Sequence, residues 1–234
     1  MTTGIVIPCY NESSRLNTAE VHVLAEAGLY VYLVDDGSTD DTFSILQGLE
    51  IPKVTIIRLA DNVGKGEAVR MGMQRAMSDG AQVVGYLDAD FATSANEMLR
   101  LVARFKEAGV SVLLGSRWLH LGAHIERFAV RHYMGRVFAT FASIILNMPV
   151  YDTQCGAKLF AVTDVLSSSL ASPFASRWIF DVELLARLKH YGYKTADFIE
   201  EPLTRWIDIS GSKVRILDLG KVVVDLVRLW LQRI

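Results

Sequence analysis

The sequence has little of several features that would each point to a particular class of protein. Its two cysteines, Cys9 and Cys155, are too few for a disulfide framework and fit a reducing compartment. The first residues, MTTGIVIPCYNE, contain no basic segment ahead of an apolar one, so we expect no secretory signal peptide. The longest uncharged apolar run, Val137 to Tyr151, is shorter than the roughly 18–20 residues that cross a bilayer. The sequence therefore predicts neither a disulfide-stapled secreted protein nor a membrane-spanning one.

The standard nucleotide-binding loops are also absent. The segment NVGKGEA contains a Gly-Lys pair, but a Walker loop would need glycine where Leu59 stands and serine or threonine where Gly66 stands. No G-x-G-x-x-G follows the first predicted strand, and IPCYNESS has no glycine-rich loop of the kind that a nucleotidyltransferase needs. These observations argue against a P-loop NTPase, a dinucleotide-dependent enzyme and a nucleotidyltransferase.

The charge is nearly balanced overall but unevenly spread along the chain. The net charge of the 234 residues is −2. Residues 1–116 carry 9 Lys/Arg against 15 Asp/Glu, whereas residues 117–234 carry 15 against 11. An acidic first half and a basic second half suggest a metal-dependent part and a part that faces an anion. We expect no nucleic-acid partner.

Short apolar runs alternate with helical patterns in the first half of the chain. The predicted strands cover residues 4–8, 29–36, 53–59, 82–90 and 110–116. The predicted helices between them are Ser13–Ala27, Asp40–Leu49, Gly64–Ser78 and Ser94–Ala108, the last with a capping box. This alternation predicts an α/β fold, a mostly parallel sheet with helices on both faces. We interpret the chain as one domain with a first part (1–116), a second part (117–213) and a C-terminal amphipathic helix (214–234).

Two pairs of aspartates follow predicted strands, where ligands bind in sheets of this kind. Asp35 and Asp36 could accept hydrogen bonds from a nucleoside, or they could simply form a turn and a helix cap. Asp88 and Asp90 lie two residues apart, so in an extended chain both carboxylates would face one hard cation such as Mg²⁺ or Mn²⁺. The alternative is two solvated turn aspartates.

The second half combines basic and apolar segments. Four arginines fall between residues 117 and 136, and they form either a solvated helix face or a site for an anionic head group. The apolar run from Val137 to Tyr151 is either buried core or a segment in a membrane interface. The helix predicted at 214–234 either packs on its own domain or contacts a membrane.

Taken in order, these motifs resemble those of a known family. IPCYNE, VDDGSTDDT, NVGKGEAV, DAD and GSR occur as in the family-2 inverting glycosyltransferases of the GT-A fold. YDTQCGAKLF, RWIFDVELL and GSKV resemble the branch of dolichyl-phosphate glucosyltransferases and their bacterial polyprenyl-phosphate relatives. The resemblance covers nearly the whole chain. Phe91 and Ala157 depart from it, because glycine and phenylalanine are usual there, and the transmembrane helices of many relatives are missing.

The resemblance implies roles for particular residues. Asp88 and Asp90 would hold Mg²⁺ or Mn²⁺ on the diphosphate of a nucleotide sugar, with Asp90 as the more direct ligand. Asp152 would lie near the acceptor as the catalytic aspartate, with Asp181 as the second candidate. The nucleotide sugar would contact Pro8, Tyr10, Glu12, Asp35, Asp36, Lys65 and Asp88. The acceptor phosphate would be bound by Arg117, Arg131, Arg205, Ser212 and Lys213.

The implied reaction moves a hexose, with glucose and a UDP-sugar favoured, to a polyprenyl or dolichyl phosphate. We expect the protein to bind the cytoplasmic face of a membrane peripherally, through residues 137–151 and 214–234. The competing enzymatic interpretation is transfer to a saccharide or protein hydroxyl, for which Asp152 or Asp181 would serve as general base. A non-catalytic protein that binds a nucleotide sugar is a third interpretation, against which the intact DAD and DTQCG motifs argue.

Overall fold

The computed structural model describes residues 1–126, 129–177 and 179–208, and for residues 129–134 it describes the backbone alone. The predicted helix 214–234, Ser212 and Lys213 lie outside the described residues, as does the side chain of Arg131. The predictions for these residues therefore stay predictions.

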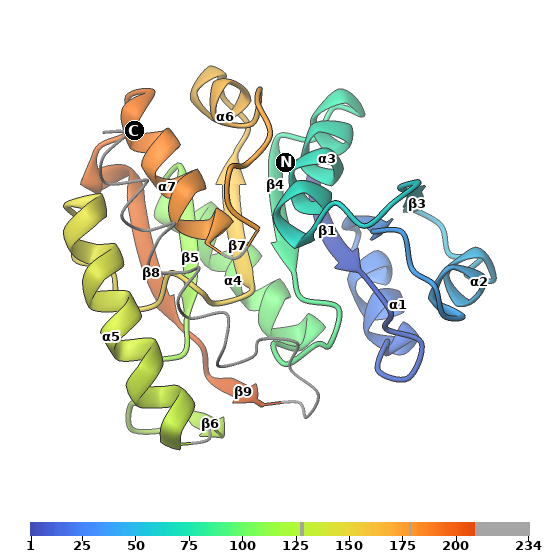
Figure 1. The fold of residues 1–234 in the computed structure, drawn as a ribbon, viewed down its shortest axis with the longest axis horizontal. Helices are drawn as coiled ribbons and strands as arrows, with labels where there is room; N and C mark the ends of the chain where they lie inside the picture. The colour runs from blue at the N-terminus through green and yellow to red at the C-terminus, as the bar shows by residue number, and fades with distance from the viewer. Residues whose placement is uncertain (127–128, 178, 209–234) are drawn as a thin grey trace.

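The centre of the molecule is a seven-stranded sheet with the order β3-β2-β1-β4-β7-β5-β8 (Figure 1). In chain order its strands are β1 (Thr3–Cys9), β2 (Tyr30–Asp35), β3 (Val54–Arg58), β4 (Val83–Leu87), β5 (Val112–Ser116), β7 (Ala157–Ala161) and β8 (Phe198–Pro202). Two short strands, β6 (His124–Glu126) and β9 (Arg205–Ile207), form a separate parallel pair. The five strands predicted in the first half are all present, and strands from both halves share the sheet.

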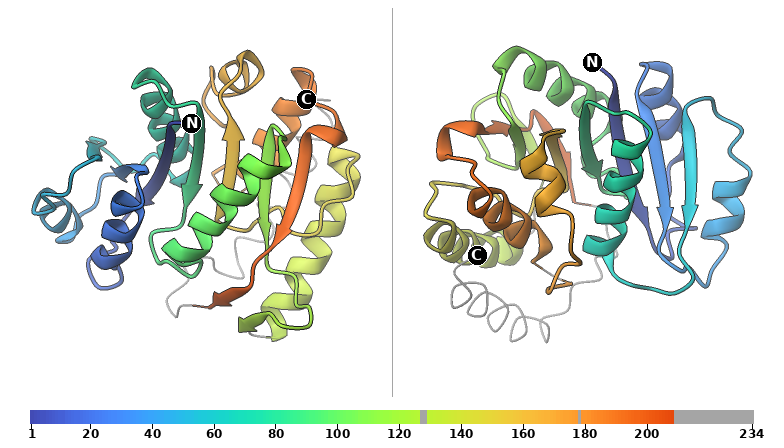
Figure 2. Two further views of the ribbon diagram at one scale, coloured as in Figure 1. Left: turned by 180° about the vertical axis from the view of Figure 1, so that it is seen from behind. Right: turned by 90° about the horizontal axis from the view of Figure 1, so that it is seen from above.

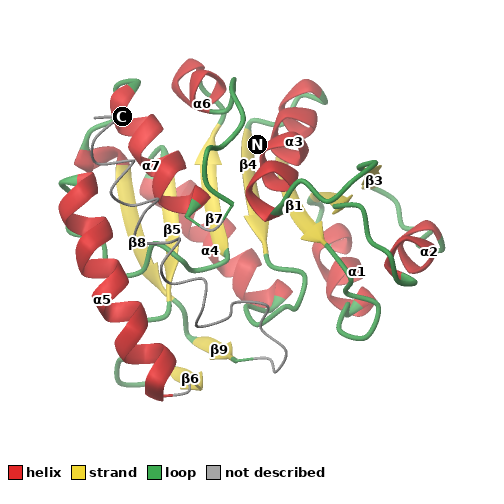
Figure 3. Cartoon of the chain, viewed as in Figure 1, coloured by secondary structure: helices red, strands yellow, loops and turns green. Residues whose placement is uncertain are grey.

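Helices cover both faces of this sheet, as the alternation predicts (Figures 2 and 3). The helices are α1 (Thr18–Glu26), α2 (Thr42–Gln47), α3 (Lys65–Ser78), α4 (Ala95–Ala108), α5 (Ala129–Leu146), α6 (Asp164–Ser169) and α7 (Phe180–His190). Successive residues of each strand enter opposite cores. In β1, for example, Val6 belongs to the core that includes residues of α3 and α7, whereas Ile5 and Ile7 belong to the core that includes residues of α1 and α4. No disulfide joins the two buried cysteines in the described part of the chain.

One strand of the sheet runs against the others. β7 is antiparallel to both of its neighbours, with Leu87 of β4 opposite Ala157 of β7. Because β7 is reversed, the residues that precede it lie at the same edge as the residues that follow β4 and β5. The segment DTQCG is thereby brought beside DAD.

The fourth strand is shorter than predicted, and this changes the account of the DAD motif. β4 ends at Leu87, so Asp88 and Asp90 lie in a turn and not in extended chain. The N–H of Phe91 donates to the carbonyl oxygen of Asp88 at 3.1 Å, which closes the turn. Phe91 has a φ of 50°, in the left-handed region that favours glycine. The glycine usual in the resembling branch therefore suits the turn, and the extended-chain alignment of the two aspartates is wrong.

Two predicted helix starts also differ in detail. Helix α1 begins at Thr18 because residues 12–16 form a turn and Asn17 caps the helix, accepting from the N–H of Ala19 at 3.1 Å. Ser94 caps α4 as predicted and accepts from the N–H of Glu97 at 3.3 Å. The carboxylate of Glu97 accepts from Arg100 of the same helix and from the N–H of the distant Thr204, so half of the predicted capping box is replaced by these contacts.

Helix α5 carries apolar side chains on two sides. Ala142 and Leu146 pack into the core, whereas Val137, Phe141 and Ile144 are 60%, 54% and 66% exposed. The latter three form one stripe because they are spaced by four and three residues. Among the described residues, no helix is both long enough and apolar enough to cross a membrane. The apolar run is thus partly core and partly surface.

Candidate functional site

The predicted residues gather at the edge of the sheet where β1, β2, β4 and β5 end, low in the view of Figure 1. Tyr10 follows β1, Asp35 ends β2, Asp88 follows β4 and Arg117 follows β5. Residues 152–156 reach the same edge because β7 is reversed. The sequence thus folds so that its acidic motifs and DTQCG share one site.

The buried carboxylate of Asp35 has one oxygen that can accept a hydrogen bond from a ligand. The side chain is fully buried, and Oδ1 accepts from the N–H of Ser38 at 3.3 Å. Oδ2 has no hydrogen-bond partner among the described residues, and its ion-pair contact, Arg58 Nε, is 3.7 Å away. Leaving a buried acceptor without a donor costs about 1–3 kcal/mol, which a ligand N–H or O–H would recover. Asp35 therefore suits the predicted contact with a nucleoside.

The carboxylate of Asp36 accepts hydrogen bonds from the protein itself. It accepts from the N–H groups of Val63 and Gly64 at 2.8 and 2.9 Å and from the Asn62 side chain at 3.0 Å. Burial raises the pKa of Asp36, and the backbone donors act in the opposite direction. Asp36 thus holds the loop that enters α3 and presents Lys65. A direct contact of Asp36 with the nucleotide stays a prediction.

The IPCYNE and DDGST segments are tied together. Asn11 has a φ of 49°; its N–H donates to Ser38 Oγ at 3.0 Å, and its Oδ1 accepts from the N–H of Thr39 at 2.9 Å. Glu12 is buried and accepts from Arg15 Nε and Nη2 at 2.9 and 2.7 Å. The carboxylate of Glu12 is thus held by an arginine next to the predicted nucleoside site.

A fixed positive charge faces the DAD turn. Nζ of Lys65, the first residue of α3, is 2.5 Å from Asp88 Oδ1. Burial works against the charge of this ammonium, but the carboxylates of Asp88, Asp181 and Asp90 raise the pKa of Lys65. Burial and the neighbouring Asp88 carboxylate raise the pKa of Asp90. The turn therefore holds two carboxylates that repel each other and one lysine that pairs with one of them.

Because Gly156 has no side chain, the Asp88 carboxylate can occupy the space beside it. The N–H of Asp88 donates to the Gly156 carbonyl oxygen at 3.1 Å. A Cβ at position 156 would overlap both carboxylate oxygens of Asp88. The motif YDTQCGAKLF contains this glycine but gives no sign of its role, because only the reversed β7 brings it against DAD.

The residues present fit a hard cation with substrate phosphates. Among the described residues, no group of three or more His, Cys, Asp and Glu side chains is arranged as a metal site. Mg²⁺ is commonly held by one or two carboxylates together with substrate phosphates, which Asp88 and Asp90 can supply. A cation would relieve the repulsion that raises the pKa of Asp90.

Asp152 and Arg117 form a bidentate ion pair in the second part of the chain, residues 117–213, which is the predicted acceptor half. Arg117 Nε and Nη2 lie 2.7 and 2.8 Å from the two oxygens of Asp152, and the Arg117 N–H also donates to Asp152 at 3.1 Å. The guanidinium lies 5.3 Å from the ring centroid of Trp206. Burial works against the charge of Asp152, yet Arg117 holds the pKa of this carboxyl well below its usual range. The structure therefore shows Arg117 bound to Asp152, and its contact with an acceptor phosphate stays a prediction.

Asp181 is likewise paired, with residues that sequence reasoning missed. It lies in the first turn of α7, buried, with Oδ1 at 2.7 Å from Lys158 Nζ and accepting from the Tyr86 hydroxyl. Lys158 also donates to the carbonyl oxygen of Cys155 at 2.5 Å. Burial raises the pKa of Tyr86, and the neighbouring Asp181 carboxylate raises it further. A lysine inside the apolar strand AKLFA was the available signal for a buried ion pair.

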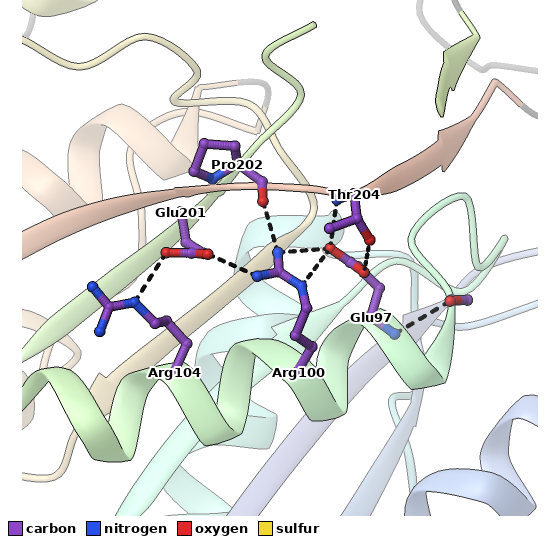
Figure 4. Close-up of polar contacts among 7 residues, drawn as sticks. Glu97, Arg100, Arg104, Glu201, Pro202 and Thr204 are labelled. Carbon is purple, nitrogen blue, oxygen red and sulfur yellow. Dashed lines mark hydrogen bonds and ion pairs between the residues drawn. The ribbon is translucent and has the colours of Figure 1, made fainter. Parts of the chain in front are cut away.

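A polar network fixes the chain between β8 and β9 against α4 (Figure 4). Arg100 donates to Glu201 Oε1 at 2.7 Å and to the Pro202 carbonyl oxygen at 2.6 Å. Glu97 accepts from the N–H and the hydroxyl of Thr204 at 2.8 and 2.7 Å. This network anchors the segment that continues into β9, which carries the exposed Arg205.

Comparisons with known proteins identify the family of this chain. Residues 4–165 match the family model described as Glycosyl transferase family 2. The chain is 31% identical to a dolichyl-phosphate beta-glucosyltransferase of Drosophila melanogaster, over 98% of this chain and 74% of that protein. It is 30% identical to the dolichyl-phosphate beta-glucosyltransferase of Saccharomyces cerevisiae, over 96% of this chain and 72% of that protein.

Among solved structures, S. aureus TarS 1–349 has a similar fold, with a TM-score of 0.63 at 15% identity. That alignment covers 100% of this chain and 65% of the TarS chain. At this identity the likeness concerns the fold alone, and it confirms the predicted GT-A arrangement. The chain is a glycosyltransferase that belongs to family 2, and it is similar over nearly its whole length to dolichyl-phosphate beta-glucosyltransferases.

Proposed function

We propose that this glycosyltransferase moves glucose from UDP-glucose to a polyprenyl or dolichyl phosphate in a metal-dependent, inverting reaction. The names of the relatives support the acceptor class and the sugar. The observation that carries the proposal is the pairing of both acidic candidates in the acceptor half, Asp152 with Arg117 and Asp181 with Lys158.

These ion pairs favour a phosphate acceptor over a hydroxyl acceptor. A hydroxyl needs a general base whose pKa lies near the working pH. Arg117 lowers the pKa of Asp152, so this carboxylate is a weak base, and the Asp181 carboxylate is already engaged by Lys158. A phosphate monoester has a second pKa of about 6 and is mostly a dianion near neutral pH. It attacks without losing a proton, and Asp152 then serves to orient Arg117 and the acceptor.

The donor side supplies binding and charge stabilisation. Asp35 accepts from the nucleoside through the buried oxygen that has no hydrogen-bond partner among the described residues. Asp88 and Asp90 would hold Mg²⁺ or Mn²⁺, which would supply positive charge for the diphosphate that leaves. Lys65, fixed by Asp88, adds a positive charge at the same place. Charge that develops on the leaving group is thus met by groups already in position.

The acceptor lipid places the reaction at a membrane surface. We propose peripheral binding at the cytoplasmic face, with the exposed stripe Val137, Phe141 and Ile144 of α5 in the interface. Basic residues such as Arg205 and Lys213 would add attraction to anionic lipid, about 1 kcal/mol for each one near the surface.

The test is a transfer assay with labelled UDP-glucose and a short polyprenyl phosphate, with polyprenol as the matched acceptor that lacks the phosphate. We expect a glucosylated lipid from the phosphate alone and none with the Asp90→Asn variant, at unchanged thermal stability. Chelation should abolish transfer, and added Mg²⁺ or Mn²⁺ should restore it. Efficient transfer to polyprenol or to a soluble sugar would instead favour a hydroxyl acceptor, and full activity in excess chelator would remove the metal from the account.

A further inference from the structure

Glu200 of β8 binds two consecutive backbone N–H groups next to the candidate catalytic aspartate. The N–H of Tyr151 donates to Glu200 Oε2 at 2.8 Å, and the N–H of Asp152 donates to Oε1 at 2.6 Å. One carboxylate thus holds the chain at the point where it enters DTQCG. Burial raises the pKa of Glu200, and the two N–H donors act in the opposite direction.

Each of the two residues that Glu200 holds also contacts an arginine. Asp152 binds Arg117 through both carboxylate oxygens. The carbonyl oxygen of Tyr151 accepts from Arg136 Nη1 at 3.0 Å, and its ring stacks with the Arg136 guanidinium at 3.8 Å from the centroid. A displacement of this backbone would therefore move two arginine contacts at once.

The neighbouring residue provides a natural comparison. Successive side chains of a strand point to opposite faces. Accordingly, Glu201 pairs with Arg100 and Arg104 of α4, on the other side of β8 from the residues that Glu200 binds. The two adjacent glutamates thus make separate contacts: Glu200 binds the backbone N–H groups of Tyr151 and Asp152, and Glu201 pairs with arginines of α4, as Figure 4 shows.

We propose that Glu200 is a positioning residue, which acts in glycosyl transfer by fixing Asp152, and with it Arg117, at the acceptor side of the site. This inference rests on the proposed function, since it concerns the same reaction. No property of the motif DTQCG itself would reveal Glu200, which lies 48 positions further along the chain.

Glu200→Gln is the appropriate perturbation because it keeps the size and shape of the side chain. A carboxylate offers two acceptors to the two N–H groups, whereas an amide offers one acceptor and turns an NH₂ group toward the other N–H. The backbone at Tyr151 and Asp152 must then shift. A displacement of about 1 Å at a reacting site can lower the rate by about a hundredfold.

The experiment measures kcat and KM with UDP-glucose and polyprenyl phosphate for the wild type, Glu200→Gln and Glu201→Gln. We expect Glu200→Gln to lower kcat by about 10- to 100-fold, with the KM for UDP-glucose unchanged. Glu201→Gln should stay within about threefold of the wild type, the scale expected for a change away from the site. Equal rates for the two glutamine variants would overturn the proposal.

A double-mutant cycle separates positioning from a general structural role. If Glu200 acts through Asp152, Glu200→Gln should have almost no further effect in an Asp152→Asn background. Multiplicative losses would show that Glu200 acts independently, and the proposal would be wrong. If the wild type itself transfers no glucose, the proposed function fails, which is distinct from a failure of this inference.

A measurement on the unchanged protein covers the case in which Glu200→Gln does not fold. In native-state hydrogen exchange, the amides of Tyr151 and Asp152 should be protected together, because one carboxylate binds both. Rapid exchange of these two amides, beside protected amides in β8, would show that the contact does not persist and would overturn the proposal.

Discussion

Replacing Gly156 by alanine should lower the rate of transfer and leave the stability of the fold nearly unchanged. Gly156 does not adopt a positive φ, so its backbone conformation is compatible with alanine. The new Cβ, however, would lie 2.5 Å from Asp88 Oδ1 and would overlap Oδ2. An ordinary contact needs about 3.5 Å, so the carboxylate must move by at least about 1 Å. The Asp88 side chain is 33% exposed and has room to turn outward.

The expected losses differ between rate and stability. A shift of about 1 Å in a group that holds the cation and the diphosphate should lower kcat by about a hundredfold, or roughly 2.7 kcal/mol in the activation free energy. Stability should change little, because Gly→Ala at a compatible position contributes about 0.4–1 kcal/mol by restricting the unfolded chain, and this offsets the crowding.

The assay is steady-state transfer with UDP-glucose and polyprenyl phosphate, alongside urea unfolding. Gly48→Ala is the matched control, because a Cβ at position 48 makes only ordinary contacts, with Ile45 and Ser44 carbonyl oxygens 3.5 and 3.7 Å away. We expect the control to keep the wild-type rate. If Gly156→Ala transfers glucose within threefold of the wild type, the packing of Gly156 on Asp88 does not set the geometry of the site.

Further predictions address stability, pH and membrane contact. Phe91→Gly should relieve about 1–2 kcal/mol of left-handed strain but lose about 3–5 kcal/mol of burial, so urea unfolding should show a net loss of about 2 kcal/mol. Lys158→Met should lower the unfolding free energy by about 3–5 kcal/mol because the buried Asp181 carboxylate loses its ion-pair partner; a loss below about 1 kcal/mol would contradict this. Burial works against the charge of Glu97, but the Arg100 and Thr204 donors lower the pKa of this carboxyl. These hydrogen bonds therefore stabilise the folded protein fully at pH values above the pKa of Glu97 in the unfolded chain. The gap in melting temperature between wild type and Glu97→Gln should therefore close as pH falls from about 5 through the folded pKa, and a constant gap would be the contrary result. Ile144→Glu should weaken vesicle binding about tenfold in co-sedimentation, whereas equal binding would exclude the α5 stripe from the interface.

The sequence predicts the fold well wherever local pattern decides. Runs such as GIVIP are buried on both sides, so they form central strands, and the helices between them follow from their apolar spacing. The gathering of Asp35 and Asp88 at one edge follows from the rule that parallel strands end together. For these residues, local pattern and global topology agree.

What the sequence does not reveal depends on contacts between distant segments. The reversed β7 places Gly156 on Asp88, and no local pattern shows that reversal. The pairing of Lys158 with Asp181 likewise joins β7 to α7. The predicted strand 82–90 extends three residues too far, because the left-handed conformation of Phe91, which closes the turn, has no signal in the local sequence. Residue types predict which side chains belong to the site, and that prediction stays open. The topology decides which protein groups contact these side chains.

The most direct test of the proposed reaction is the structure of the product formed from UDP-glucose and polyprenyl phosphate with Mg²⁺. NMR of the purified lipid should show glucose joined through a phosphate to the polyprenyl chain, in the β configuration that a single inverting displacement from an α-linked donor produces. Asp90→Asn should yield none of it. Glucose attached to a hydroxyl, an α linkage, or equal yield from the Asp90→Asn variant would contradict the account.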